Sequence, residues 1–348
     1  MAYTDIDKPS DYFNTVLYTG NASASRSITG VGFQPDWLWV KGRSTAYYHA
    51  LWDVVRTNKS ALYSNVTNAE DTGTGGTLGS FNSDGFTLPN ESGGFVNNNG
   101  TTYTAWNWKA GTSFTNDASA TGIGSVDSTG SVNTDAGFSI VSWTSLASGS
   151  NYTIAHALGV KPDVIIMKGR HESNSWQVYH HKNTSSPETD YLELNSTAAT
   201  ADYPVWNDTA PTSSVFSLGT WSGFDAGGTM IAYCFAEKQG YSKFSSYVGN
   251  GGNQFIYTGF KPAFVIEKRS SNASEWDMYD NKRNTFNSVT KVLKPNASDA
   301  EATYGGLNFL SNGFEAKGSL NDSGQTLIYM AFAENPFVTS TGVPATAR

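Results

Sequence analysis

The chain has 348 residues, a formal net charge of −8, 14% aromatic and 15% charged residues, and one cysteine, Cys234. This composition excludes intrinsic disorder, and one cysteine excludes an internal disulfide. The acidic balance argues against a nucleic-acid partner, and the absence of any apolar run near ~20 residues argues against membrane insertion. Because residues 1–15 lack the pattern of a signal peptide, we expect synthesis in the cytoplasm.

The first predicted segment, residues 1–11, precedes the first alternating apolar pattern and is expected to form an arm. A block with a central proline then occurs three times, and its residues are PDWLWVKGR, PDVIIMKGR and PAFVIEKR. The prolines are Pro35, Pro162 and Pro262. Short apolar runs bounded by Pro and Gly are typical of buried strands, and a proline suits the first residue of a strand.

Further landmarks follow each block in the same order. Trp52, Trp176 and Trp276 each open a short alternating run, and we expect all three to be buried. Each copy then closes on an aromatic strand around an alanine, of which Tyr103-Thr104-Ala105-Trp106 is the first example. Repetition of several landmarks in one register predicts three copies of one structural unit.

The predicted fold is all-β, with three tandem jelly-roll-like β-sandwich domains of about 100 residues each. Asn, Gly, Ser and Asp clusters mark turns between the strands, and no long amphipathic helix is predicted. We expect three separate beads joined by a Gly/Ser/Thr-rich linker. The predicted segments are an arm at 1–11, repeat 1 at 12–111, the linker at 112–135, repeat 2 at 136–238, repeat 3 at 239–338 and a C-terminal tail at 339–348.

Copy one carries a resemblance to a known group of proteins. The runs Tyr18-Thr19-Gly20-Asn21, Asp84-Gly85-Phe86 and Ala105-Trp106-Asn107-Trp108-Lys109, together with the block around Pro35, resemble a repeat of virion proteins from marine tailed phages. The resemblance implies a structural role on a phage particle, as in tail fibres and receptor-binding proteins. It implies location in the virion after assembly in the host cytoplasm, and it supplies no catalytic residues.

The motifs that could carry chemistry favour structural explanations. His180 and His181 are neighbours, and neighbours in a strand point to opposite faces, so one metal ion cannot easily take both. No carboxylate pair recurs in all three repeats, although a glycosidase needs two carboxylates. The glycine-rich stretches lack a following helix, so no nucleotide cofactor is predicted. We therefore expect no catalytic residues, no metal and no cofactor.

Two features could contact a partner. The first is a basic motif after each buried strand, Lys41-Gly42-Arg43, Lys168-Gly169-Arg170 and Lys268-Arg269. We favour a solubilising position at a turn or sheet edge over contact with an acidic partner. The second is a set of aromatic residues outside the repeated positions, which we predict to bind a ligand such as a glycan. These residues are Tyr47, Tyr48, Tyr203, Trp206 and Trp221.

Three functions remain open at this point. The first is a non-catalytic phage structural protein in a tail fibre or appendage, which binds other virion proteins and contacts a host glycan or receptor. The second is a capsid decoration or cement protein of the same fold, and the third is a glycan-degrading tail enzyme. Fibre proteins are commonly symmetric oligomers, so we expect a homo-oligomer, with a trimer as the first hypothesis, attached through residues 1–11.

Overall fold

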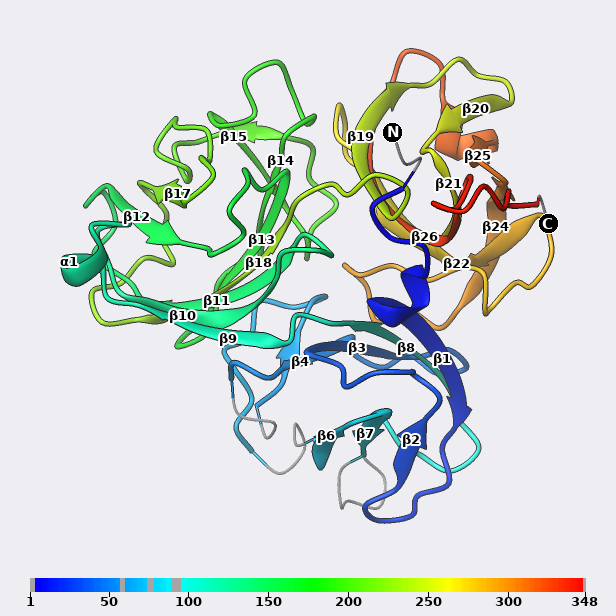
Figure 1. Ribbon diagram of the computed structural model, residues 1–348, viewed down its shortest axis with the longest axis horizontal. Helices are drawn as coiled ribbons and strands as arrows, with labels where there is room; N and C mark the ends of the chain where they lie inside the picture. The colour runs from blue at the N-terminus through cyan, green and yellow to red at the C-terminus, as the bar shows by residue number, and fades with distance from the viewer. Residues whose placement is uncertain (1–3, 57–59, 74–77, 89–94, 347–348) are drawn as a thin grey trace.

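The computed structural model describes residues 4–56, 60–73, 78–88 and 95–346. This part of the chain is all-β and forms three lobes around a common centre (Figure 1). We define lobe 1 as residues 12–111, lobe 2 as 112–238 and lobe 3 as 239–338. The described helices are short, namely η1 (Pro9–Asp11), α1 (Ala118–Thr121) and η3 (Gly318–Asn321). No helix in these ranges is long and apolar enough to cross a membrane.

Lobe 1 contains two antiparallel sheets. Its strands are β1 (Phe13–Thr19), β2 (Ser27–Thr29), β3 (Trp37–Gly42), β4 (Ala50–Asp53), β5 (Leu62–Tyr63), β6 (Ser80–Asn82), β7 (Gly85–Thr87) and β8 (Thr102–Trp108). The larger sheet has the order β1-β8-β3-β4-β5, and the smaller has the order β2-β7-β6. The two sheets enclose one apolar cluster, in which Leu38, Trp52 and Phe86 are buried.

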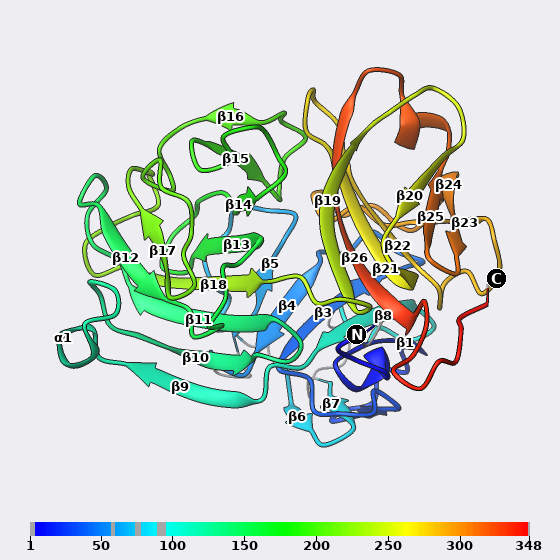
Figure 2. The ribbon, with the colours of Figure 1, turned by 45° about the horizontal axis from the view of Figure 1, so that its top comes forward.

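Lobe 2 has the largest sheet of the molecule among the described residues, with eight strands (Figure 2). Its strands are β9 (Thr112–Asn116), β10 (Ser128–Asn133), β11 (Phe138–Thr144), β12 (Tyr152–Ala155), β13 (Val164–Gly169), β14 (Gln177–His180), β15 (Asp190–Glu193), β16 (Ala201–Asp202), β17 (Val215–Leu218) and β18 (Thr229–Phe235). The sheet order is β16-β15-β14-β13-β18-β11-β10-β9, and β12 and β17 form a second pair.

Lobe 3 again pairs two sheets, here of four strands each. Its strands are β19 (Ser242–Val248), β20 (Gln254–Tyr257), β21 (Phe260–Arg269), β22 (Trp276–Asp280), β23 (Val289–Val292), β24 (Ala302–Leu310), β25 (Gly313–Ala316) and β26 (Thr326–Pro336). The orders are β19-β26-β21-β22 and β20-β25-β24-β23. The described lobes are therefore sandwich-like units of antiparallel sheets.

The three lobes share one strand order, as the sequence repeats predict. The runs β1-β8-β3-β4, β11-β18-β13-β14 and β19-β26-β21-β22 are equivalent by their neighbours. The residue two positions after each proline also pairs with an equivalent position on the closing strand of its lobe. Trp37 lies opposite Trp108, Val164 opposite Phe235 and Phe264 opposite Phe332. Pro35, Pro162 and Pro262 therefore occupy equivalent positions.

Trp52 of lobe 1 is not structurally equivalent to Trp176 and Trp276, although the sequence spacing aligns the three. In the register of the paired strands, Trp52 lies opposite Leu38, whereas Trp276 lies opposite Lys268. Trp52 thus faces the interior of its own sandwich, and Trp176 and Trp276 face the common centre. All three are buried as predicted. The residue of lobe 1 equivalent to Trp176 and Trp276 is His49, which sequence spacing misses because the residue type differs.

The segment expected as a flexible linker, residues 112–135, instead contains β9, α1 and β10 and adds two strands to the sheet of lobe 2. Its Thr and Ser residues fit a half-exposed edge strand. Gly130 permits the close pairing, because a Cβ there would lie 2.1 Å from the carbonyl oxygen of Ile140. A composition rich in small polar residues does not distinguish an edge strand from a linker.

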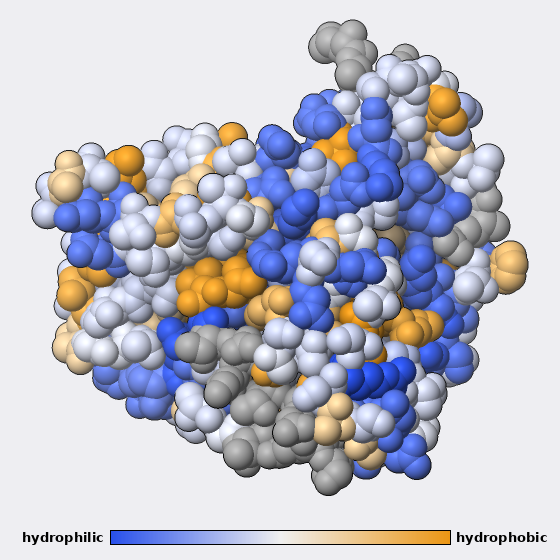
Figure 3. Space-filling model, turned by 60° about the horizontal axis from the view of Figure 1, so that its bottom comes forward, coloured by the Kyte–Doolittle hydropathy of each residue, from blue (hydrophilic) through white to orange (hydrophobic). Residues whose placement is uncertain are grey.

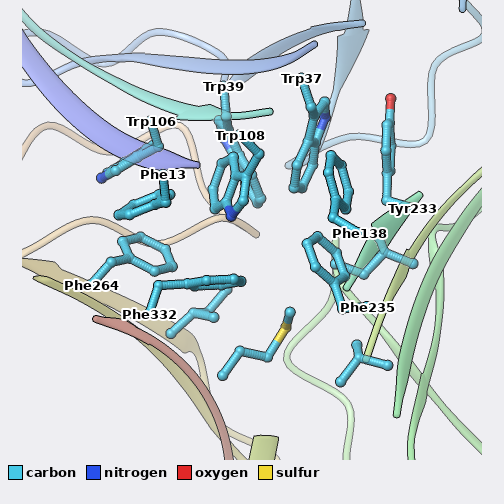
Figure 4. Packing of buried hydrophobic residues seen from close by; sticks show 14 of the residues in the cluster. Phe13, Trp37, Trp39, Trp106, Trp108, Phe138, Tyr233, Phe235, Phe264 and Phe332 are labelled. Atoms are coloured by element: carbon cyan, nitrogen blue, oxygen red, sulfur yellow. The ribbon is translucent and has the colours of Figure 1, made fainter. Parts of the chain in front are cut away.

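The common centre is a single aromatic core to which all three lobes contribute (Figure 4). Trp37 of lobe 1 stacks on Tyr233 of lobe 2, with 4.3 Å between ring centroids. Lobes 1 and 3 meet through Trp108 and Phe332 at 5.7 Å, and lobes 2 and 3 through Phe235 and Phe332 at 5.9 Å. Each lobe therefore contacts both others, and the expectation of three separate beads was wrong. The lobes form a closed ring.

The basic motifs fasten this ring and do not lie at its surface. Lys41, Lys168 and Lys268 are buried, and each side chain donates to a backbone carbonyl of a neighbouring lobe. The acceptors are Ser298 for Lys41 at 3.0 Å, Thr67 for Lys168 at 3.1 Å and Thr197 for Lys268 at 3.0 Å. Burial lowers the pKa of Lys168 to about 7 and the pKa values of the other two lysines to about 8. The solubilising position favoured from the sequence was wrong.

Two of the three junctions also contain a buried chain of charges. Between lobes 1 and 2, Arg56 bonds Asp53 and Glu70 at 2.7 Å each, and Arg170 of lobe 2 bonds the same Glu70. Burial opposes the charge of Arg56, but Asp53, Tyr233 and Glu70 outweigh it and raise the pKa of the guanidinium.

The junction between lobes 3 and 1 repeats this arrangement. Arg283 bonds Asp280 at 2.5 Å and Glu301 at 3.4 Å, and Arg43 of lobe 1 forms two hydrogen bonds to Glu301. The indole of Trp106 donates to Asp280, as the hydroxyl of Tyr233 does to Asp53 in the other junction. The two networks therefore match group for group, apart from the donors Trp106 and Tyr233.

The junction between lobes 2 and 3 is built from neutral groups at the equivalent positions. His180 and Asn183 replace the Asp and Arg, and Thr200 replaces the Glu. His180 donates from Nε2 to the carbonyl of Tyr329 at 3.1 Å, and burial lowers its pKa to about 3. The backbone bond from Thr200 to Ser270 has counterparts from Glu70 to Arg170 and from Glu301 to Arg43. Ser270, and not Arg269, is therefore equivalent to Arg43 and Arg170.

The N-terminal segment lies against the ring in the part that the structure describes. Ile6 is buried in the central core, and the hydroxyl of Thr4 donates to the carbonyl of Gln239 in lobe 3. Asp7 accepts hydrogen bonds from the backbone and the side chain of Ser340 in the C-terminal tail. Residues 4–11 thus contribute to the packing of the body, which was not expected of an arm.

Candidate functional site

The aromatic residues predicted to bind a ligand do not form one site. Tyr47 and Tyr48 belong to lobe 1, where the Tyr47 hydroxyl bonds Asn98 and the Tyr48 ring packs on Tyr63 at 5.3 Å. Tyr203 belongs to lobe 2, packs on Tyr191 and is 43% exposed. Tyr48 and Tyr203 therefore remain accessible, on different lobes.

Trp206 and Trp221 are core residues of lobe 2. They are 1% and 5% exposed, and their rings pack on Tyr179 and Phe224 respectively. The prediction treated them as loop residues because they lie outside the repeated positions. The loops of lobe 2 fold back over its sandwich, so a position outside the repeat can still be buried.

His180 and His181 are both occupied by backbone contacts between lobes 2 and 3. The Nε2 atom of His181 donates to the carbonyl of Phe244 at 2.6 Å, and Nδ1 lies 3.1 Å from Asp163. His180 bonds Tyr329, as described above. The pair therefore holds the neutral junction together.

A different group of residues could hold a metal ion. Among the described residues, the ligand atoms of His171, Glu172 and Asp225 lie within 4.8 Å of one another. His171 is exposed, and its Nε2 atom is 3.2 Å from Asp225. Nothing else at this surface position distinguishes it from an ordinary cluster of exposed polar groups.

Among the described residues, one feature with the volume of a ligand site is a cleft of about 390 Å³ on lobe 3, where the chain enters from lobe 2. Ligand pockets usually have volumes of about 300–1,000 Å³. Residues 237–243 form one wall, and the turn after β20 together with Phe337 forms the other. Tyr257, at the end of β20, is 61% exposed, and Phe337 is 38% exposed. Two accessible aromatic rings therefore flank the opening.

The polar wall of the cleft is held in place by its own bonds. Glu237 accepts from the backbone of Phe244 and from the side chain of Lys243, both at 2.7 Å. Its backbone nitrogen donates to Asp163 at 2.8 Å, which joins the wall to the neutral junction. Lys238 adds a second cation beside this pair. The cleft thus offers a carboxylate, two ammonium groups and aromatic faces at fixed positions.

The opposite wall depends on a glycine turn. Gly259 has a φ of +85°, which favours glycine, and the carbonyl of this residue accepts from the backbone of Phe337 at 3.2 Å. A Cβ on Gly259 would lie 3.4 Å from the hydroxyl of Tyr257. The turn therefore brings Tyr257 and Phe337 to the same opening without a side chain between them.

Sequence reasoning missed this cleft. Tyr257 follows the alternation Gln254-Phe255-Ile256-Tyr257, in which Ile256 is buried and both aromatic rings are exposed. The prediction considered only aromatic residues outside the repeats and did not include this strand, in which one buried aliphatic residue lies between two exposed aromatic ones. On the face shown in Figure 3, hydrophobic residues form separate patches between polar ones.

The comparisons with known proteins identify a family but no activity. No curated protein matches the chain. Residues 8–336 match the family described as "Domain of unknown function (DUF7483)", so the match extends over all three lobes. The chain therefore belongs to this family.

Proposed function

We propose that the protein is a non-catalytic structural protein of a phage particle, in a tail fibre or appendage, and that it contacts a glycan of the host surface. The resemblance of the first repeat to virion proteins supports the location. We also propose that the three lobes are tandem jelly-roll-like units. The analogy with fibres also predicts a trimer of this chain. This stays a prediction, because the threefold similarity in the structure is between lobes of one chain.

The observation that carries this proposal is that titratable groups with shifted pKa values form bonds between the lobes. Groups with strongly shifted pKa values often mark active sites. Here the three buried lysines, whose pKa values are lowered, donate to carbonyls of neighbouring lobes, and Arg56 belongs to the network that joins lobes 1 and 2. A rigid body with loops directed outward is suited to present contacts.

The cleft on lobe 3 is the proposed contact with the host glycan. Tyr257 and Phe337 offer apolar faces to a sugar ring, and Glu237, Lys238 and Lys243 offer donors and an acceptor for its hydroxyl groups. Because Lys238 and Lys243 outnumber Glu237, a sugar that carries a carboxylate would be favoured over a neutral one.

The glycan-degrading alternative would need a reactive carboxylate that the substrate can reach. Asp277 and Glu267 form one of the two pairs of described carboxylates that lie opposite each other on neighbouring strands, the other being Asp190 and Asp202. Glu267, however, is 2% exposed inside the sandwich of lobe 3, so a glycosidic oxygen cannot approach it in this conformation. This pair therefore does not favour hydrolysis as the function.

The binding proposal can be tested with purified protein and surface polysaccharide from a susceptible host. We expect Tyr257→Ala to weaken binding by at least about tenfold, which corresponds to about 1.4 kcal/mol. Tyr203→Ala removes a similarly exposed ring from lobe 2 and is the matched control, with unchanged affinity expected. Equal affinities for the two variants and the unchanged protein would contradict a site in the cleft.

The location can be tested separately by antibody labelling of intact particles. Label on the tail or its appendages agrees with the proposal. Label distributed over the capsid shell would favour a decoration protein. Release of oligosaccharides from the polysaccharide by the purified chain would contradict the non-catalytic role.

A further inference from the structure

The interior of lobe 3 departs from the other two lobes at one pair of facing residues. In the equivalent register, Val40 faces Ala50 in lobe 1, Met167 faces Gln177 in lobe 2 and Glu267 faces Asp277 in lobe 3. Like charges directly opposite each other on neighbouring strands are destabilising. Lobe 1 folds with an apolar pair, so the carboxylates of lobe 3 are not required by the fold.

Three tyrosines, two of them from other strands, lie around this pair. Tyr247 on β19 donates to Glu267 at 3.2 Å and to the carbonyl of Leu320 at 2.6 Å. Tyr304 on β24 donates to Asp277 at 2.9 Å. Tyr279 lies two residues after Asp277 on β22, on the same face of the strand. Hydroxyl oxygens of these tyrosines therefore lie around the two carboxylates.

Some of these oxygens lack a partner among the described residues. They are Oε1 of Glu267 and the hydroxyl of Tyr279, and both atoms are fully buried. Buried polar atoms nearly always have a hydrogen-bond partner, so two unpartnered oxygen atoms on the same face of the sheet need an explanation. Tyr279 lies opposite Val265, so its side chain projects from the same face of the sheet as both carboxylates.

The two nearby cations do not form ion pairs with these carboxylates, and Lys294 pairs with Glu275 instead. Arg269 follows Glu267 by two residues on β21, but its terminal nitrogen bonds Ser319 and Asp322, and no bond joins it to Glu267 or Asp277. Its Nε atom is a further buried donor without a partner among the described residues. The pair thus carries unbalanced negative charge when ionised.

We propose that Glu267 and Asp277 bind a divalent cation, with Ca²⁺ as the favoured ion. All the surrounding ligand atoms are oxygens, which hard cations prefer over the nitrogen and sulfur ligands of zinc. Calcium tolerates irregular sites with carboxylates, carbonyls and water, whereas magnesium demands near-octahedral geometry. Asp277 is only partly buried, so the ion can enter from its side of the sandwich.

The experiment measures thermal unfolding in EDTA and in millimolar CaCl₂. For the unchanged protein we expect Ca²⁺ to raise the midpoint by at least about 4 °C, because an ion that binds only the folded state stabilises it. The double variant Glu267→Val/Asp277→Ala, which installs the pair of lobe 1, should lose this response and be at least as stable in EDTA as the unchanged protein. Glu275→Gln is the control for a nearby carboxylate and should keep the response.

A second readout does not depend on stability. Terbium bound beside Tyr247, Tyr279 and Tyr304 should give tyrosine-sensitised luminescence that Ca²⁺ displaces, and Glu267→Gln should remove it. A midpoint unchanged by Ca²⁺ together with absent luminescence would overturn the proposal, and the carboxylates would then share a proton. Luminescence that persists in Glu267→Gln would also overturn it, because the ion would lie elsewhere.

Discussion

The junction between lobes 1 and 2 and the junction between lobes 2 and 3 share their backbone bonds but differ in their side chains. The first contains Asp53, Arg56 and Glu70, and the second contains His180, Asn183 and Thr200 at the equivalent positions. In both, a buried lysine donates to a carbonyl of the neighbouring lobe. Backbone bonds and apolar packing therefore close the ring at both junctions, while the charges are an addition that two junctions have and one lacks.

The largest expected effect comes from breaking one charged network. Arg56→Met keeps much of the side-chain volume but leaves Asp53 and Glu70 buried with one cation fewer. We expect a loss of about 3–5 kcal/mol in the free energy of unfolding, because an uncompensated buried charge is costly. Urea unfolding followed by tryptophan fluorescence measures this loss.

The matched control is Asn183→Ala at the neutral junction, where the substitution removes the hydrogen bond from Thr200. Its expected cost is about 1 kcal/mol. If both variants lost the same stability, the charged and neutral junctions would not differ as the structure implies.

A smaller effect is expected when the whole network is made neutral. The four substitutions Asp53→His, Arg56→Asn, Glu70→Thr and Arg170→Ser give the first junction the side chains of the second. Removal of a complete buried network leaves no unpaired charge, so we expect a cost of only about 0–2 kcal/mol in the same urea assay. A loss greater than that of Arg56→Met alone would show that the charges themselves close the ring.

The smallest expected effect concerns the carboxylates inside lobe 3. Both pKa values are raised in the folded state, so their stabilising contribution is present below about pH 4 and is lost as the pH rises, in the case of Asp277 through about 6. In calcium-free buffer, the unchanged protein should lose at least about 1 kcal/mol relative to Glu267→Val/Asp277→Ala between pH 4 and pH 7. The groups that face the pair are Arg269, Glu275, Lys294, Tyr247, Tyr279 and Tyr304.

Urea unfolding of both proteins across this pH range measures the difference between them, which cancels the titration of the rest of the chain. A difference that does not change with pH would mean that neither carboxyl group has a raised pKa.

The repeats made the strand order predictable, because Pro35, Pro162 and Pro262 precede strands with the same partners. The closed ring was not predictable, because period-2 patterning cannot tell which of two buried faces meets another lobe. In β3, for example, Leu38 faces its own sandwich and Trp39 faces the centre, but the sequence predicts only that both are buried.

The sequence predicted that aromatic residues would form the candidate site, but it did not predict the location of the site. The sequence pointed to aromatic residues outside the repeats, but it gave no means of separating the buried Trp206 from the exposed Tyr257. The recurring lysines were misinterpreted for a related reason. A charged residue after a strand is usually exposed, and only the packing of a second lobe over Lys168 makes it a buried donor.

The shared aromatic core implies that the three lobes unfold as one cooperative body. Differential scanning calorimetry of the whole chain tests this claim most directly. A closed ring predicts one transition whose calorimetric enthalpy equals its van't Hoff enthalpy. Three separable transitions, each with the enthalpy of about one third of the chain, would contradict the ring and restore the interpretation as independent beads.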